Sequence, residues 1–342
     1  MKKTNLLAVL ALAASSFYLH AQSTVSTPIV GFSTVTAAAN GGAGTKYSLV
    51  AANLLNSPSW SGSINGSLAA AAGSFTAGAF NAGSVYAKYY VEIVDGSAAG
   101  SQADIISNTT DTLTVDDQAA FQTAVGSGAT VKIRKHRTLV DLFGGVSGTI
   151  GDTTVAIAKG TSLSTADNVI LKENGVDKSF YYSSSSLRPG WRDAGGNLAT
   201  DRPVYPNQGA IIARKSNSAA NIVVTGEVKQ GVTFVDLPAG YNLITLPVPS
   251  DSTLPSFFGG SSGTTGATDV KIAKASTLSA ADNILIAQTD GSYKTYYYSS
   301  NSFRPGWRDS AGTLSSSVTI LGSSSIFIKK VANGSLTSTS SF

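Results

Sequence analysis

The chain has 342 residues, only 13% of them charged, and it contains no cysteine. The lack of cysteine excludes disulfides and cysteine-ligated zinc, so stability must come from packing, which a chain of this length can supply. With 24 basic against 20 acidic residues, the net charge is too small to indicate a nucleic-acid-binding protein. Abundant Gly, Ser, Thr and Ala suit β-strands joined by tight turns.

The N-terminus has the three parts of a secretory signal peptide. Lys2 and Lys3 form the charged start, an apolar stretch runs from Leu6 to about Phe17, and Ala21 ends a fitting cleavage site. We predict a signal peptide over residues 1–21 and an exported chain that is periplasmic, cell-surface or extracellular. Removal of this signal peptide leaves 22 basic against 20 acidic residues. No later segment resembles a transmembrane helix.

The mature chain contains an internal duplication. The stretch from Thr138, TLVDLFGGVSGTIGDTTVAIAKGTSLSTADNVIL, aligns with that from Thr253, TLPSFFGGSSGTTGATDVKIAKASTLSAADNILI, at a constant offset of 115 residues. After one added residue the match continues through SFYYSSSSLRPGWRD and TYYYSSNSFRPGWRD. We infer that one structural unit is present twice.

Weaker similarity extends both copies towards the N-terminus. GVTFVDLPAGYNLITLPVP precedes the second copy, and its counterpart near the start of the mature chain is GFSTVTAAANGGAGTKYSLVAANLL. We therefore predict a discontinuous first unit over residues 22–55 plus 138–230, an insertion over residues 56–137, and a second unit over residues 231–342.

The insertion divides into two parts. Residues 56–84 lack clean periodicity and are rich in small residues, which predicts a mobile loop. The strand-like runs that follow are YAKYYVEIVDG, ADIISN, DTLTV and ATVKIRKH, and DDQAAFQTAVGSG predicts a short helix capped by Asp116 or Asp117 and ended by Gly126.

Each unit carries the same local signals. Two β-rich runs flank Asn174-Gly175 in the first copy and Asp290-Gly291 in the second, and both dipeptides favour a tight hairpin. Helical turns are predicted before each hairpin, with Ser164 and Asp167 or Ser279 and Asp282 as capping pairs, and another at Thr253–Phe258, ended by Gly259-Gly260.

The predicted fold is all-β: two tandem homologous units, each a small β-sandwich or open barrel, the first interrupted by a small β-rich subdomain with one short helix. The chain resembles a family of exported bacterial β-rich repeat proteins. The resemblance is carried by the segments YYVEIVDGSAAGSQADIISNTTDTLTVDD and VKIRKHRTLVDLFGG and by the tyrosine run before GWR. The resemblance covers nearly the whole mature chain. It implies a secreted β-protein and carries no activity, ligand or catalytic residue.

The repeated motif RPGWRD has a structural and a functional interpretation. Pro189-Gly190 fits the centre of a type II turn, and burial of an indole would by itself preserve the motif in both copies. Alternatively, the tryptophans, with Tyr181, Tyr297 and the tyrosines that follow them, form exposed platforms for sugar rings, while the arginines hold carboxylates or sulfates. We favour the structural interpretation. The candidate ligand-binding residues are Trp191, Arg188, Arg192, Tyr182, Trp307, Arg304, Arg308 and Tyr298.

Sites for catalysis or metal are poorly supported. His136, the sole histidine of the mature chain, lies in the basic cluster KIRKHR and is interpreted as a solvated strand-end residue. No acid–His–Ser set can be assembled from the sequence, and Asp116-Asp117 is best explained as a helix cap. Asp193, Asn197 and Asp201 offer oxygen ligands for calcium, and the second copy, DSAGTLSSS, loses two of the three. We predict no catalytic residue, no cofactor and no metal.

The expected function is non-enzymatic: a structural, adhesive or assembly-forming protein of the cell surface or extracellular space. The alternative is a carbohydrate-binding module that uses the Trp/Tyr/Arg hairpins to hold a polysaccharide. No nucleic-acid partner is expected. The strand-like residues 22–35 suggest self-association by strand addition, because the C-terminal strand, NGSLTSTSSF, looks degenerate and polar.

Overall fold

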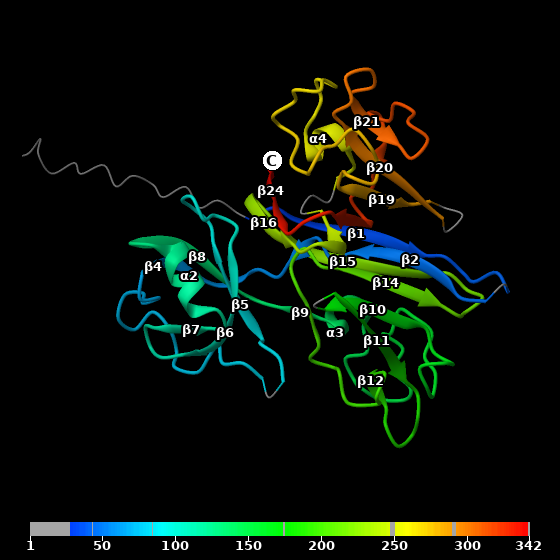
Figure 1. The fold of residues 1–342 in the computed structure, drawn as a ribbon. Helices are drawn as coiled ribbons and strands as arrows, with labels where there is room; N and C mark the ends of the chain where they lie inside the picture. The colour runs from blue at the N-terminus through cyan, green and yellow to red at the C-terminus, as the bar shows by residue number, and fades with distance from the viewer. Residues whose placement is uncertain are drawn as a thin grey trace, which may run out of the picture.

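A computed structural model describes residues 28–42, 44–83, 85–173, 175–246, 250–288 and 292–340 (Figure 1). The named strand pairs in these ranges are all antiparallel, and the fold is all-β, as predicted. Buried apolar side chains form separate clusters in the first unit, the second unit and the insertion. The predicted signal peptide lies outside the described residues.

The first unit is a small sandwich of two sheets. One sheet has the order β12 (Gly190–Asp193), β11 (Val176–Ser183), β10 (Asn168–Glu173), β14 (Gly209–Arg214) and β2 (Lys46–Ala51). The other has the order β1 (Val30–Ala37), β15 (Ala220–Val228) and β3 (Leu54–Leu55). Alternation along the strands points one face of each sheet into a shared core, where Ile222 and Val224 of β15 meet Val169 and Ile212 of the larger sheet. Short elements complete the unit: β9 (Arg137–Thr138), α3 (Leu139–Phe143) and β13 (Pro203–Val204).

The second unit repeats this topology. Its five-stranded sheet has the order β17 (Gly240–Thr245), β23 (Ser325–Lys330), β19 (Asn283–Ala287), β20 (Tyr293–Ser299) and β21 (Gly306–Asp309). The remaining elements are β16 (Gly231–Leu237), β24 (Gly334–Ser340), β18 (Ser252–Thr253), β22 (Thr319–Ile320) and α4 (Leu254–Phe258). The register is also repeated, since Tyr182 lies opposite Trp191 and Tyr298 opposite Trp307. The prediction of two homologous units is confirmed.

Several local predictions are confirmed in the repeated units. Helix α4 begins at the cap residue Thr253, whose hydroxyl accepts from the Ser256 N–H, and it ends at Gly259 with a φ of 80°. Both hairpins form, with Glu173 opposite Val176 and Ala287 opposite Tyr293. Asn174, Asp290 and Gly291 themselves lie outside the described residues.

The insertion forms its own five-stranded sheet, with the order β4 (Pro58–Asn65), β8 (Gly128–Lys135), β5 (Tyr89–Ile93), β6 (Gln102–Asn108) and β7 (Leu113–Val115), and with helix α2 (Gln118–Val125). The prediction of a mobile loop over residues 56–84 is wrong for most of this segment. Residues 58–65 pair with β8, and Leu68, Phe75 and Phe80 are buried in the core of the insertion. The small residues between these apolar side chains concealed the pattern.

The terminal strands are both paired within the chain. β1 lies along β15 from Val30 to Ala37, and β24 lies along β16 from Gly334 to Ser340. The polar C-terminal strand is therefore not degenerate: Leu336 and Ser338 alternate inward and are buried, while serines and threonines face outward. Residues 22–27 of the predicted N-terminal strand lie outside the described range.

The two units meet through a reciprocal pair of hydrogen bonds. The N–H of Ala51, at the end of β2, donates to the carbonyl of Ser323 at 3.2 Å. At the equivalent positions, the N–H of Thr245, at the end of β17, donates to the carbonyl of Asn207 at 2.9 Å. Such reciprocity is the mark of an approximate two-fold relation between the units.

Near this approximate axis the equivalent positions are Gly209 and Ser325, the first residues of β14 and β23. The Ser325 hydroxyl donates to the Val50 carbonyl at 2.7 Å. A Cβ on Gly209 would lie 2.6 Å from the Ser325 Oγ and 2.7 Å from the Leu243 Cγ. The junction therefore has room for a side chain at only one of the two positions.

We predict that Gly209→Ser destabilises the protein by about 1–3 kcal/mol, because it overpacks the junction. The double variant Gly209→Ser with Ser325→Gly removes the clash with the Ser325 hydroxyl but not the one with Leu243, so it should recover part of this loss. Urea unfolding of the wild type and the variants, followed by tryptophan fluorescence, measures both effects. A Gly209→Ser variant as stable as the wild type would contradict the close approach.

Candidate functional site

The tryptophans of the repeated motif are core residues. Trp191 and Trp307 are 0% and 1% exposed. Each indole N–H donates to the carbonyl of the glycine that ends the preceding short helix, Gly144 at 2.8 Å in the first unit and Gly259 at 2.9 Å in the second. The structural interpretation of these two rings is confirmed, because buried rings cannot stack on a sugar.

The tyrosines opposite the indoles belong to the same packing. Tyr182 and Tyr298 are buried and meet the indoles edge to face, with ring centroids 5.8 Å and 5.7 Å away. A Cβ on Gly145 would lie 2.4 Å from the Tyr182 ring, and one on Gly260 would lie 2.2 Å from the Tyr298 ring. The second glycine of each FGG triplet is therefore required by the approach of a tyrosine.

One arginine of each motif supports its own loop. The Nη2 group of Arg192 donates to the Pro189 carbonyl at 3.0 Å, and that of Arg308 donates to the Pro305 carbonyl at 3.0 Å. Gly190 has the positive φ, 94°, that the predicted turn requires, yet the hydrogen-bonded turn lies earlier, between Ser185 and Arg188. These arginines therefore have a structural role in both copies.

The other arginine of each motif has no such role. Arg188 and Arg304 are exposed, and neither has a carboxylate within ion-pair distance among the described residues. Each guanidinium lies beside a glycine, because a Cβ on Gly196 would be 3.3 Å from Arg188 Nη1 and one on Gly312 would be 3.5 Å from Arg304 Nη1. Both charges are therefore held near the surface without a protein counter-ion.

We call these regions the twin pockets. The first has a volume of about 580 Å³, and its lining includes Tyr181, Arg188, Gly196 and Lys215. The second has a volume of about 360 Å³, and its lining includes Tyr297, Arg304, Arg308 and Gly312. Equivalent tyrosine, arginine and glycine residues thus line both, and each pocket has an exposed arginine and a tyrosine in its lining.

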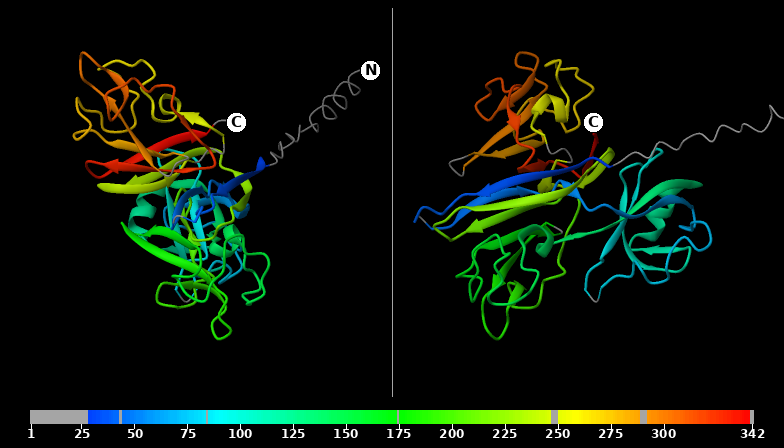
Figure 2. Two further views of the ribbon diagram at one scale, coloured as in Figure 1. Left: turned by 90° about the vertical axis from the view of Figure 1, so that its right-hand side faces the viewer. Right: turned by 180° about the vertical axis from the view of Figure 1, so that it is seen from behind.

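A large apolar side chain projects from the loop at each pocket. Leu187 is 89% exposed, and its equivalent Phe303 is 93% exposed. The strands that follow these loops, β12 and β21, lie at opposite ends of the molecule, with the sheets of both units between them (Figures 1 and 2). Leu187 and Phe303 were not predicted as site residues. The sequence offered one signal for them, because the equivalent loop position carries an apolar residue in both copies.

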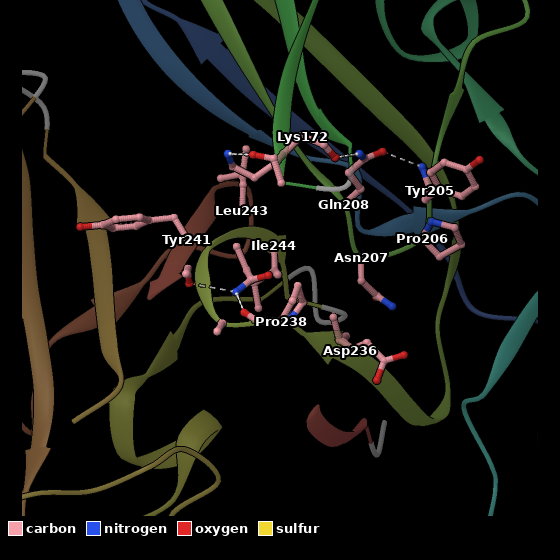
Figure 3. A pocket seen from close by; sticks show the side chains of 15 residues that line it. Lys172, Tyr205, Pro206, Asn207, Gln208, Asp236, Pro238, Tyr241, Leu243 and Ile244 are labelled. Carbon is pink, nitrogen blue, oxygen red and sulfur yellow. Dashed lines mark hydrogen bonds between the residues drawn. The ribbon is translucent and has the colours of Figure 1, made fainter. Parts of the chain in front are cut away.

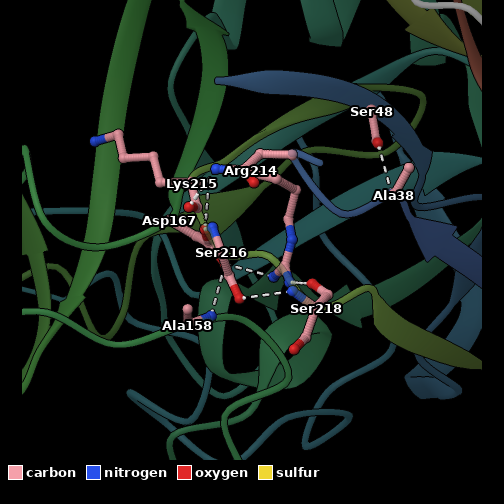
Figure 4. A network of polar contacts seen from close by, with 9 residues as sticks. Ala38, Ser48, Ala158, Asp167, Arg214, Lys215, Ser216 and Ser218 are labelled. Atoms are coloured by element: carbon pink, nitrogen blue, oxygen red, sulfur yellow. Dashed lines mark hydrogen bonds and ion pairs between the residues drawn. The ribbon is translucent and has the colours of Figure 1, made fainter. Parts of the chain in front are cut away.

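The repeated acids before each hairpin are buried ion-pair partners, and the capping prediction for them is wrong. Asp167 is fully buried and forms an ion pair with Arg214 (Figure 4). Its carboxylate also accepts from the N–H groups of Ala158 at 2.7 Å and Lys215 at 2.7 Å. This carboxylate ties the end of β14 to the segment before β10.

The second unit keeps this network with a different cation. Asp282 is fully buried, forms an ion pair with Lys330, and accepts from the N–H groups of Ala273 at 2.8 Å and Val331 at 2.9 Å. The detectable signal was the pairing of a repeated acid with a repeated cation at the end of a later strand. We conclude that Asp167 and Asp282 serve the fold.

His136 is buried, and its interpretation as a solvated residue is wrong. It is 2% exposed, its Nε2 lies 2.8 Å from Asp104 Oδ1, and its ring packs against Tyr90 and Tyr205. Burial and the neighbouring Asp104 carboxylate raise the pKa of Tyr205 to about 12. This cluster fills the seam between the insertion and the first unit.

Both arginines of the basic cluster around His136 are also buried, while Lys135 is exposed. Arg134 donates to Glu227 Oε1 at 2.6 Å, and Arg137 donates through Nε to the Leu54 carbonyl at 2.6 Å. Glu92 forms a further ion pair at this seam with Lys229. The cations of this seam therefore hold the insertion on the first unit.

A separate groove lies between the two units, and we call it the inter-unit groove (Figure 3). It has a volume of about 530 Å³. Its first wall is formed by residues 205–208, which precede β14, together with Lys172, and its second wall by residues of β16, β17 and the turn between them. The side chains that face it include Asn207, Asp236 and Tyr241.

Neither metal ligands nor a membrane-spanning helix is found in the described residues. Asp193 accepts from the N–H and the side-chain amide of Asn197 at 2.8 Å and 3.0 Å, so these two calcium candidates form a local turn. No cluster of three or more His, Cys, Asp or Glu residues is placed to hold a metal there. No described helix is long and apolar enough to cross a membrane.

Comparison with known proteins finds no matching family model, curated protein or solved structure. The function is therefore argued from the geometry of the chain itself.

We predict that Asp167→Ala lowers the free energy of unfolding by about 3–5 kcal/mol, because it leaves the Arg214 guanidinium buried without its counter-ion. The matched control is Asp193→Ala, which removes an acid that only supports a turn, and its loss should be about 1 kcal/mol. Chemical denaturation of the two variants compares them. Equal effects would show that Asp167 is not an important ion-pair partner.

Proposed function

We propose that the protein is a non-enzymatic adhesive or structural protein of the cell surface or extracellular space, and that it contacts its surroundings through the twin pockets. The observation that carries this proposal is the presence of two equivalent exposed ends, each with an apolar residue and an arginine that has no counter-ion among the described residues. Because these ends face opposite directions, one molecule can bridge two partners.

The ligand that suits the twin pockets is a polysaccharide with carboxylate or sulfate groups. Arg188 and Arg304 offer the planar, permanently charged group that such anions bind best. The buried members of the repeated motif are explained by the core, and Arg192 and Arg308 by their loops. The exposed pair has no comparable structural reason to be present twice, and ligand binding supplies one.

The environment of His136 supports the non-enzymatic proposal. This histidine is enclosed by two tyrosines and bonded to Asp104 at the seam. General acid–base catalysis requires a group that can reach a substrate, and a ring with 2% exposure in a packed seam does not meet this requirement. The resemblance to exported bacterial β-rich repeat proteins agrees with the proposed setting outside the cell.

We expect the mature protein to bind polygalacturonate or dextran sulfate more strongly than neutral dextran, and to cross-link the anionic polymer. Arg188→Ala or Arg304→Ala alone should leave one working end, so binding persists while turbidity from cross-linking is lost. The double variant should lose binding by roughly tenfold or more. Affinity electrophoresis and light scattering measure the two properties.

The matched control is the double variant Lys178→Ala with Lys294→Ala, which removes two exposed cations from β11 and β20 and leaves the loops intact. It should bind and cross-link like the wild type. If both single arginine variants still cross-link the polymer, or if the control loses binding equally, the proposed role of the two ends is wrong.

Self-association through β1 is a second candidate, favoured by one specific feature. β1 ends its sheet, so one side of its backbone is unpaired among the described strands. Its eight residues include no charge and no proline, the usual protections of an exposed edge. Phe32, on the outward face, is 75% exposed. A second copy could therefore add its own β1 in antiparallel pairing.

We expect the mature protein to associate in a concentration-dependent manner in sedimentation velocity, and Phe32→Lys to shift it towards monomer by charging the edge. Circular dichroism checks that the variant retains its β structure. A wild-type protein that sediments as a monomer at all concentrations would remove this candidate and leave the twin pockets unaffected.

A further inference from the structure

We propose that the inter-unit groove is a second binding site, distinct from the twin pockets, and that it takes an uncharged saccharide. Asn207 lies between β13 and β14 and lines the groove. It has a left-handed backbone with a φ of 64°, and among the described non-glycine residues it shares this property only with Leu68. Pro206 and Asn207 are the two central residues of a turn in which the Gln208 N–H donates to the Tyr205 carbonyl at 3.0 Å, and asparagine adopts the positive φ of such a turn readily.

The side chain of Asn207 has no protein partner among the described residues. Its backbone carbonyl accepts from the Thr245 N–H at 2.9 Å, but its amide makes no hydrogen bond. The residue is 7% exposed, and its amide points into the groove on the side of Asp236 (Figure 3). An amide that borders a groove without a protein partner can form its hydrogen bonds with a ligand or with water.

The approximate two-fold relation shows that the junction itself does not need this residue. Ser323 is the equivalent of Asn207, and its carbonyl makes the corresponding bond to the Ala51 N–H at 3.2 Å. Ser323 makes this bond without a positive φ. The left-handed backbone of Asn207 belongs to its own turn, and its side-chain amide, which has no partner among the described residues, is not needed to hold the units together.

The walls of the groove suit a hydroxyl-bearing ring. Tyr241 lies at one end of the groove, and Tyr205, whose ring packs against His136, lies at the other, while Pro206 and Pro238 are among the residues that line it (Figure 3). Tyr241 is 51% exposed, so part of its ring is open to a ligand. Apolar walls with a few convergent polar groups are typical of small-ligand sites, which are common at interfaces between domains. A sugar suits both the apolar walls and the polar groups, because its ring packs on tyrosine while its hydroxyls bond to amide and carboxylate.

The charges in the groove favour an uncharged ligand. Lys172 is the one cation among the lining residues, and its Nζ is already 3.0 Å from Asp177 Oδ1 and 3.2 Å from the Gly175 carbonyl. Asp236 is exposed and has no ion-pair partner among the described residues. A carboxylate that faces the groove repels an anion, which separates this site from the twin pockets.

The test is isothermal titration calorimetry of the mature protein with cellohexaose and mannohexaose, and with hexagalacturonate as the charged comparison. At least one neutral hexasaccharide should bind, and Tyr241→Ala and Asn207→Gly should each weaken it by roughly three- to tenfold. Asn207→Gly removes the amide and keeps the left-handed backbone, so the variant should fold normally. Thermal unfolding verifies this.

Two controls make the result specific to the groove. Tyr47→Ala removes the equivalent tyrosine of the first unit, which is 55% exposed and lies outside the groove, and it should not change the affinity. Arg188→Ala with Arg304→Ala should also leave neutral binding intact, which separates a failure here from a failure of the twin pockets. Absence of binding to both neutral hexasaccharides, or binding that neither Tyr241→Ala nor Asn207→Gly weakens, overturns the proposal.

Discussion

The hydrogen bond from a buried indole to a glycine carbonyl fixes the geometry of each unit. It ties the β11–β12 or β20–β21 hairpin to the end of the short helix before it, with donor–acceptor distances of 2.8 Å and 2.9 Å in the two copies. A tyrosine then closes over the second glycine of the FGG turn, where no Cβ has room. Indole, tyrosine and glycine pair are thus interdependent, and changing one would leave either a cavity or a clash. This is why the motif is present twice and why most of it is buried.

The parts of the fold that could be predicted are those that local chemistry determines. Asp or Asn next to glycine between β-rich runs indicated the hairpins, and threonine before an apolar segment ended by glycine indicated α4. Asp167 and His136 were misjudged for the opposite reason. An acid beside a turn and a histidine at a strand end both look exposed, and only the tertiary fold brings Arg214 to one and Asp104 to the other. The strand at 58–65 was missed because serine and glycine separate its apolar residues.

Of the candidate site, the sequence predicted the motif but not which of its members reach the surface. Alternation along a strand separates Trp191 from Arg192, yet it does not distinguish Arg192, which supports its loop, from Arg188, which has no protein counter-ion. That distinction depends on where the loop carbonyls point. The apolar tips at Leu187 and Phe303 depend in the same way on how each loop leaves its strand. The inter-unit groove could not be predicted at all, because its two walls come from different units.

Duplication of a unit gives two copies of every surface. Positions at which the two copies carry different residues identify the places where the copies acquired separate roles. The cores of the two units differ little: Lys330 takes the place of Arg214, and the buried carboxylate has a cationic partner in both. At the junction the two copies differ where two side chains would collide, so Gly209 of one unit faces Ser325 of the other. Neither packing nor collision explains why Asp236 stands where the first unit has Thr36. A difference that the fold does not require is the kind that a ligand on one side of the axis would select.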